Sequence, residues 1–241
     1  GGLPKLLELT ELSDREEYLR SYVRTYLKEE IIAEQVIRKI DPFRDFLKIA
    51  AQSNGQIINY SKIASDVGVD DKTVHSYFQI LEDTLVGHFL NPYHRSVRKR
   101  QREAPKFYLF DPGVKRALEQ TLRSELVPQT YAYGRAFEHF VFLEAIRLNE
   151  YRRLDYEFSY LRTKDGAEID LIIERPGAAT LLVEIKSSET VNEKASSGLE
   201  RFSMDWKGRV ETRVWSRDPS VRKIGKTVFL PWDEGLKEAG L

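Results

Sequence analysis

The sequence predicts an α/β protein whose first half is helical and whose second half combines helices with a central mixed sheet. Before about residue 123, most apolar side chains recur three and four residues apart, the spacing of a helix that buries one face. From about residue 156, apolar and polar side chains alternate in short runs that are separated by turns such as Lys164-Asp165-Gly166. A length of 241 residues suits one or two domains.

Composition excludes several classes of protein. The 38 Lys and Arg residues balance 38 Asp and Glu residues, so any contact with nucleic acid must come from a local basic patch. The absence of cysteine excludes disulfides, thiolate zinc sites and a cysteine nucleophile, and fits a cytoplasmic location. No apolar run approaches the roughly 20 residues of a membrane span, so no membrane partner is expected. Because the chain begins at Gly1-Gly2 without methionine, we interpret it as part of a longer protein.

Residues 1–40 are predicted to form a helical segment. Ser13 and Glu16 have the spacing of a capping box, and an aromatic stripe through Tyr18 and Tyr22 continues to about Lys39. Such a stripe requires a packing partner. The partner is either the same domain or a preceding domain of which this helix is a remnant.

Residues 41–123 have the pattern of a winged helix. Asp41-Pro42 begins one helix, a short helix follows at 61–67, and Gly68 separates it from a longer helix that begins near Asp70. Two strands, 85–90 and 106–110, complete the pattern. The exposed face of the longer helix carries polar side chains suited to the edges of DNA bases: Lys72, Thr73, Ser76 and Gln79.

A basic loop lies between those two strands. Its cationic residues are Arg95, Arg98, Lys99, Arg100 and Arg102. Neutralisation of DNA phosphates is one interpretation of this loop, and a solubilising hairpin tip is the other. Winged helices also serve as protein-docking modules, so the pattern alone does not decide between them.

Residues 124–241 place charged side chains on apolar elements. Glu138 lies in line with Val141 and Phe142 on a largely apolar helix predicted at 134–149. Asp170 lies within a predicted strand at 168–174, and Glu184 and Lys186 share one face of a strand at 181–186. Three carboxylates that converge beside an amine would suit Mg²⁺ or Mn²⁺, whereas a charge network without metal is the alternative.

The order of these residues resembles the PD-(D/E)xK nuclease superfamily: an acidic residue on a helix, then one on a strand, then acid-x-Lys on the next strand. The segment Gly134 to Phe140 adds to the likeness. This resemblance implies a restriction-endonuclease-like domain with Glu138, Asp170 and Glu184 as metal ligands and Lys186 as the catalytic lysine. It implies a metal-dependent phosphodiesterase that acts on DNA.

The first half also resembles part of a known group. The segments Glu17 to Val23 and Tyr26 to Ile31, followed by the winged-helix pattern and the nuclease-like module, are similar to the C-terminal half of prokaryotic AAA-type ATPases. This implies that residues 1–40 are a remnant of the ATPase lid and that the ATPase domain, a partner, precedes Gly1. No Gly-x-x-x-x-Gly-Lys-Ser/Thr motif occurs, so no ATP site is expected in this chain.

Three functions therefore stay open. The first is a metal-dependent nuclease module, and the second is a catalytically inactive module that binds DNA or a protein. The third is an assembly piece that does neither. A homo-oligomer is compatible with each of the three.

Overall fold

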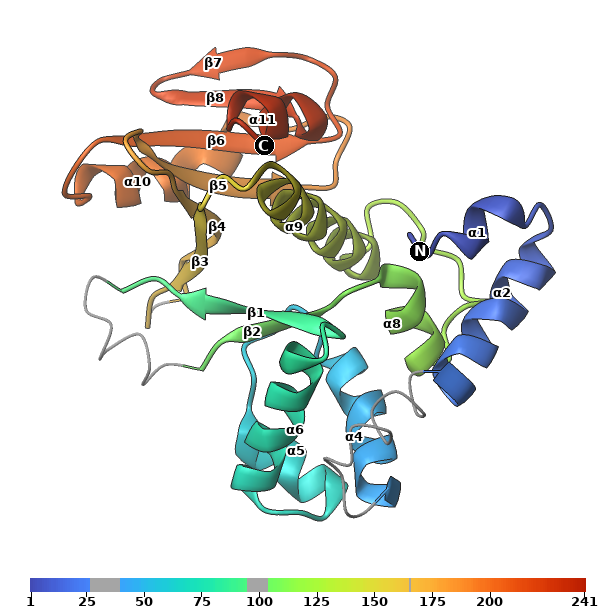
Figure 1. The fold of residues 1–241 in the computed structure, drawn as a ribbon. Helices are drawn as coiled ribbons and strands as arrows, with labels where there is room; N and C mark the ends of the chain where they lie inside the picture. The colour runs from blue at the N-terminus through green and yellow to red at the C-terminus, as the bar shows by residue number, and fades with distance from the viewer. Residues whose placement is uncertain (27–39, 95–103, 165) are drawn as a thin grey trace. The chain divides into compact units, whose positions relative to one another are not determined.

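The computed structural model describes residues 1–26, 40–94, 104–164 and 166–241, and it confirms an α/β protein with a mixed sheet (Figure 1). The chain forms two compact units. Unit 1 comprises Gly1–Phe89 and Ala104–Glu125, and unit 2 comprises Leu90–Glu103 and Leu126–Leu241. The finer division into segments 1–40, 41–123 and 124–241 stays a prediction.

Unit 1 consists mainly of helices. Its elements are α1 (Lys5–Glu8), α2 (Leu12–Ser21), the π-helical η1 (Tyr22–Tyr26), α4 (Ile40–Gln52), α5 (Tyr60–Val67), α6 (Asp71–Asp83), the start of β1 (Gly87–Pro92), β2 (Lys106–Leu109) and α8 (Pro112–Leu118). Its core is aromatic: Phe46 of α4 packs edge-on against Phe78 of α6 at 4.8 Å between ring centres. Both rings are buried.

The two helices of the predicted recognition motif have well-defined ends. The Asn59 side chain accepts a hydrogen bond from the Lys62 backbone N–H at 3.0 Å and begins α5. Gly68 ends α5 in the left-handed region, at φ 75°, where glycine carries no Cβ penalty. Asp70 then begins α6 by accepting from the Thr73 N–H at 2.8 Å. The expected helix, glycine turn and second helix are therefore present.

The predicted capping box at Ser13 is wrong. Helix α2 begins at Leu12, with Glu11 as its N-cap and no side-chain cap bond, so Ser13 already lies inside the helix. The Ser13 hydroxyl lies 3.4 Å from the Asp14 carboxylate instead. Capping requires the extended backbone that precedes a helix, and here Glu11 has it. The chain continues from α2 as η1 to Tyr26, and the rest of the predicted continuation, residues 27–39, lies outside the described residues.

Unit 2 is built on a mixed sheet. Its elements are the end of β1, α9 (Tyr131–Arg152), β3 (Glu157–Arg162), β4 (Glu168–Glu174), β5 (Thr180–Lys186), η2 (Glu193–Ser196), α10 (Ser197–Met204), β6 (Val210–Ser216), β7 (Arg222–Ile224), β8 (Thr227–Pro231) and α11 (Trp232–Glu238). The strand order of the sheet is β2-β1-β3-β4-β5-β6-β8-β7, and β2 with the start of β1 belongs to unit 1. Strands β3, β4 and β5 pair antiparallel, whereas β5, β6 and β8 pair parallel.

The strand beside β3 in this sheet is β1. Asn91 and Pro92 pair in parallel with Ser159 and Tyr160 of β3. Beyond the strand, the Tyr93 ring packs against the Trp206 ring at 4.6 Å between centres. Residues 90–93 therefore belong to the packing of unit 2, although residues 104–125 of the returning chain belong to unit 1.

Helices cover both faces of the sheet. Leu199 of α10 packs with Leu182 of β5 and Val214 of β6 on one face. Trp215, the next residue of β6, points to the other face by strand alternation and meets Gly235 of α11. Figure 1 shows α10 and α11 on opposite sides of β6. The buried strands β4 and β5 thus lie in the centre of a three-layer arrangement.

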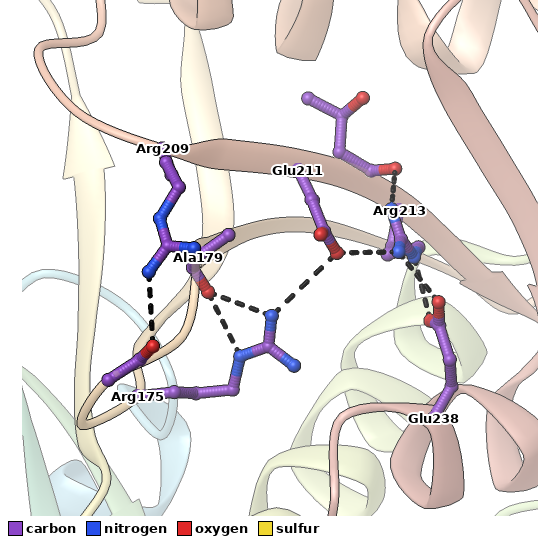
Figure 2. Close-up of polar contacts among 8 residues, drawn as sticks. Arg175, Ala179, Arg209, Glu211, Arg213 and Glu238 are labelled. Atoms are coloured by element: carbon purple, nitrogen blue, oxygen red, sulfur yellow. Dashed lines mark hydrogen bonds and ion pairs between the residues drawn. The ribbon is translucent and has the colours of Figure 1, made fainter.

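An ion-pair network fixes α11 to β6 (Figure 2). The guanidinium of Arg213, on β6, donates to both carboxylate oxygens of Glu238 at 2.6 and 2.7 Å and to Glu211 at 2.7 Å. Arg175 approaches the same Glu211 carboxylate at 3.7 Å. The Arg213 side chain is only 9% exposed, so the network includes a largely desolvated charge.

Replacing Gly235 by alanine should destabilise unit 2. A Cβ atom there would lie 2.3 Å from the indole of Trp215, which is fully buried and cannot move aside. We expect a loss of about 1–3 kcal/mol in the free energy of unfolding, measured by urea denaturation followed by tryptophan fluorescence.

Gly198→Ala in α10 is the matched control for this prediction. A Cβ atom at Gly198 meets no atom within 4 Å, so the helix propensity of alanine should leave stability unchanged or raise it by up to about 1 kcal/mol. Equal stability of the two variants would contradict the close approach of α11 to β6.

Within the four described ranges, no helix combines the length and the hydropathy that a membrane span requires.

Candidate functional site

The candidate site lies in unit 2, where β4 and β5 cease to pair. Main-chain pairing of the two strands extends to Leu171 and Val183. One residue further, the Asp170 carboxylate accepts a hydrogen bond from the Ile185 backbone N–H at 2.8 Å. A side chain thus takes the place of a main-chain acceptor, and this bond fixes the Asp170 carboxylate beside the two charged residues of β5.

Glu184 and Lys186 form a direct ion pair. The Lys186 ammonium donates to Glu184 Oε1 at 2.5 Å, and both side chains project from the same face of β5. The Glu184 side chain is 17% exposed, whereas that of Lys186 is 41% exposed. The carboxylate is therefore the more desolvated partner, and the amine is accessible to a ligand.

Glu138 reaches the same cluster from α9. Its side chain is 15% exposed and lies 3.7 Å from the Arg135 guanidinium in the preceding turn. The negative charge of Glu138 acts on both Glu184 and Lys186. The structure therefore brings the four predicted residues from three elements into one electrostatic neighbourhood, while their chemical roles stay predictions.

The electrostatics of the pair follow from burial and from the neighbouring carboxylates. Burial raises the pKa of Glu184, and the charges of Glu168 and Glu138 raise it further, against the opposing effect of Lys186. Burial alone would lower the pKa of Lys186, but the charges of Glu184, Asp170 and Glu138 outweigh it and raise that pKa. Lys186 is therefore an ammonium group at neutral pH.

Glu168 belongs to this cluster, although the sequence analysis assigned it no role. It lies on β4 two residues before Asp170 and, by strand alternation, on the same face. Its charge acts on Glu184. The signal in the sequence was the repeat of acidic residues at alternate positions of an otherwise apolar strand.

The cluster fits a divalent cation in its chemistry but not as a preformed cage. Carboxylate oxygens are the donors that Mg²⁺ and Mn²⁺ prefer. Three carboxylates here act on the Lys186 ammonium group, and a fourth, that of Glu168, acts on Glu184. Among the residues that the structure describes, however, no three acidic or histidine side chains are gathered closely enough to hold a metal ion. Mg²⁺ often binds through one or two carboxylates plus substrate phosphates, and such a site needs no complete protein cage.

The predicted DNA-reading residues lie on α6 of unit 1. Several already make bonds within the helix: Thr73 Oγ1 donates to Asp70, Ser76 Oγ to the Lys72 carbonyl, and Gln79 Nε2 to Asp83. Lys72 is exposed. The five predicted basic residues of the loop, Arg95, Arg98, Lys99, Arg100 and Arg102, lie outside the described residues. DNA contact by either group stays a prediction.

Comparisons with known proteins give two family matches. The family described as Domain of unknown function (DUF4143) matches residues 133–232, which include Glu138, Asp170, Glu184 and Lys186. The family described as Domain of unknown function (DUF8612) matches residues 1–125.

Two curated relatives are similar to most of the chain. They are Uncharacterized protein Mb2031c of Mycobacterium bovis and Uncharacterized protein Rv2008c of Mycobacterium tuberculosis, each 28% identical over 180 residues, or 73% of this chain. The aligned stretch covers 39% of either relative. No solved structure matches. Because the match to residues 1–125 spans more than half of the 241 residues, the chain belongs to the family described as Domain of unknown function (DUF8612).

Proposed function

We propose that the chain is a metal-dependent nuclease module of the PD-(D/E)xK kind, which cleaves phosphodiester bonds in DNA. The observation that carries the proposal is the Glu184–Lys186 pair, with a bond of 2.5 Å, on which the charges of Glu138 and Asp170 also act. Carboxylates on apolar elements carry a desolvation cost that a purely structural role does not require. A cation and a phosphate would offset that cost.

Each residue of the cluster has a distinct part in this proposal. Glu138, Asp170 and Glu184 would hold the cation, with Asp170 kept in place by the Ile185 N–H. A bound divalent cation would polarise the phosphate and lower the pKa of a water molecule. The Lys186 ammonium would then stabilise the negative charge that develops on the phosphate, because it is the exposed member of the pair.

Unit 1 would hold the nucleic acid in this proposal. In this proposal α5, α6 and the two following strands would serve as a winged helix, and the basic residues among 95–102 would contact phosphates. A larger protein is also part of the proposal, because the relatives extend well beyond the matched stretch. The family that matches residues 133–232 is commonly found in ATPase-associated proteins, which supports an AAA-type ATPase as the remaining part.

Incubation with supercoiled plasmid DNA tests the proposed activity. Wild-type protein should nick or linearise the plasmid in Mg²⁺ or Mn²⁺, and EDTA should abolish the cleavage. Linear duplex and single-stranded DNA serve as further substrates. No cleavage of any of these in either cation would contradict the proposal.

A catalytically inactive binding module is the second candidate. It is favoured by the absence, among the described side chains, of a ready three-ligand group for a metal ion. This candidate predicts no heat of Mg²⁺ or Mn²⁺ binding in calorimetry, but DNA association that weakens as salt rises. An assembly piece would show neither metal binding nor DNA association, so calorimetry and a gel shift at two salt concentrations separate the three functions.

A further inference from the structure

Arg217 is held in a defined position directly after β6. Its guanidinium donates to the Tyr133 hydroxyl at 2.6 Å and to Glu189 at 2.7 Å. The guanidinium carbon also lies 5.4 Å from the centre of the Tyr133 ring. Two hydrogen bonds and a ring contact restrict the long side chain, so less entropy would be lost when it binds a further group.

This position is next to the candidate site. Lys186, the last residue of β5, is paired in parallel with Ser216, and Arg217 follows Ser216 directly. Tyr133 belongs to the first turn of α9, the helix that carries Glu138. A Cβ atom at the neighbouring Gly134 would lie 3.7 Å from Ser187 Oγ, so this turn lies against the end of β5. Arg217 and Lys186 therefore lie at the same edge of the sheet.

We propose that Arg217 is a substrate-binding residue that contacts a backbone phosphate of the nucleic acid beside the phosphate at Lys186. This inference rests on the proposed function. It adds a contact with a second phosphate, which the carboxylate cluster does not provide. The planar guanidinium matches two phosphate oxygens at once, whereas the Lys186 ammonium is a point charge that fixes no orientation. Arg217 and Lys186 together would therefore set the direction in which the nucleic-acid strand crosses the site.

The ion pair with Glu189 does not prevent this role. The Glu189 side chain is 69% exposed, and exposed ion pairs contribute little to stability. A phosphate could take the place of that carboxylate while the bond to Tyr133 keeps the guanidinium oriented. The alternative is a purely structural role, in which Arg217 only links α9 to the end of β6.

Fluorescence anisotropy with a labelled DNA duplex tests the inference. Binding is measured in EDTA and in Ca²⁺, between about 50 and 200 mM salt, and a gel verifies that the probe stays intact. Arg217→Ala should weaken binding roughly tenfold at low salt. It should also reduce the slope of log affinity against log salt by about 0.9, the value of one phosphate contact. Labelled single-stranded DNA and RNA of the same sequence show which nucleic acid the contact serves.

Arg209→Ala is the matched control, because Arg209 precedes the same strand and its side chain donates to the Gly177 carbonyl, at 3.1 Å. Its salt slope should equal that of wild type.

Two conservative variants test the same position. Tyr133→Phe removes the hydroxyl acceptor and keeps the ring, and Arg217→Lys keeps the charge without the planar group. Both should retain the wild-type slope, and Arg217→Lys guards against an alanine variant that does not fold.

The outcomes separate the inference from the proposed function. A slope for Arg217→Ala equal to those of wild type and Arg209→Ala would overturn the phosphate contact while leaving a nuclease module intact. Equal affinity loss for Arg217→Ala and Tyr133→Phe, with unchanged slopes, would also overturn it and indicate the structural link. Failure of the wild-type protein to bind any of the three nucleic acids would overturn the proposed function, and the inference with it.

Discussion

Lys186→Ala should lower the rate of plasmid cleavage by about 100- to 1,000-fold, the usual loss when one group that stabilises a transition-state charge is removed. The physical reason is the position of the ammonium, which is bonded to Glu184 yet is the more exposed partner. Lys186→Arg keeps the charge and should retain part of the rate. The measurement is the initial rate of nicking in Mg²⁺ at saturating protein.

The metal affinity of Lys186→Ala shows whether a lower cleavage rate reflects the missing ammonium group or a disrupted site. Without the ammonium, Glu184 stands among the charges of Glu138 and Glu168 with no cation bonded to it, so Mn²⁺ should bind at least as tightly as in wild type. Lys194→Ala, in the exposed start of η2, is the control and should leave both rate and affinity unchanged. Cleavage by Lys186→Ala at the wild-type rate would contradict the assignment of Lys186 as the catalytic lysine.

Arg213→Ala should lower the free energy of unfolding of unit 2 by about 3 kcal/mol, since it breaks a largely buried ion pair. The variant loses the paired bonds to Glu238, the bond to Glu211 and the packing of the aliphatic stem (Figure 2). Arg213→Met keeps most of that apolar volume, so its loss should be clearly smaller than that of the alanine variant.

Tryptophan fluorescence in urea suits this measurement. All three tryptophans, Trp206, Trp215 and Trp232, lie in unit 2, so their emission reports that unit alone. Arg209→Ala, at an exposed position in the same region, should stay within about 0.5 kcal/mol of wild type. A loss for Arg213→Ala no larger than that of the control would mean that the network in Figure 2 does not hold α11 in place.

The strands of the candidate site were predictable because their pattern is strong. Residues 168–174 lie between two glycine-containing turns and form β4 as expected, and β5 extends only one residue beyond the predicted 181–186. The helix with Glu138 was predicted at 134–149 and spans Tyr131–Arg152. Once the face of each strand is known, the proximity of Asp170, Glu184 and Lys186 follows from alternation.

Other features could not be inferred, for physical reasons. The bond from the Ile185 N–H to Asp170 depends on where pairing between β4 and β5 ends, which side-chain type does not determine. A strand as short as β7, at Arg222–Ile224, is too short for any periodicity to appear. The hydrogen bond from Arg217 to Tyr133 joins residues 84 positions apart, so no local sequence pattern indicates it.

The crossing of β1 between the two units has a consequence for how the protein can be divided. Asn91 and Pro92 pair with β3, and the chain then returns to complete unit 1 before Leu126. A fragment that starts after Glu125 would lack this strand and the Tyr93 ring, leaving the main-chain groups of β3 bare and prone to self-association. The two units are thus interleaved along the chain, so division of the chain at one position cannot give two complete units.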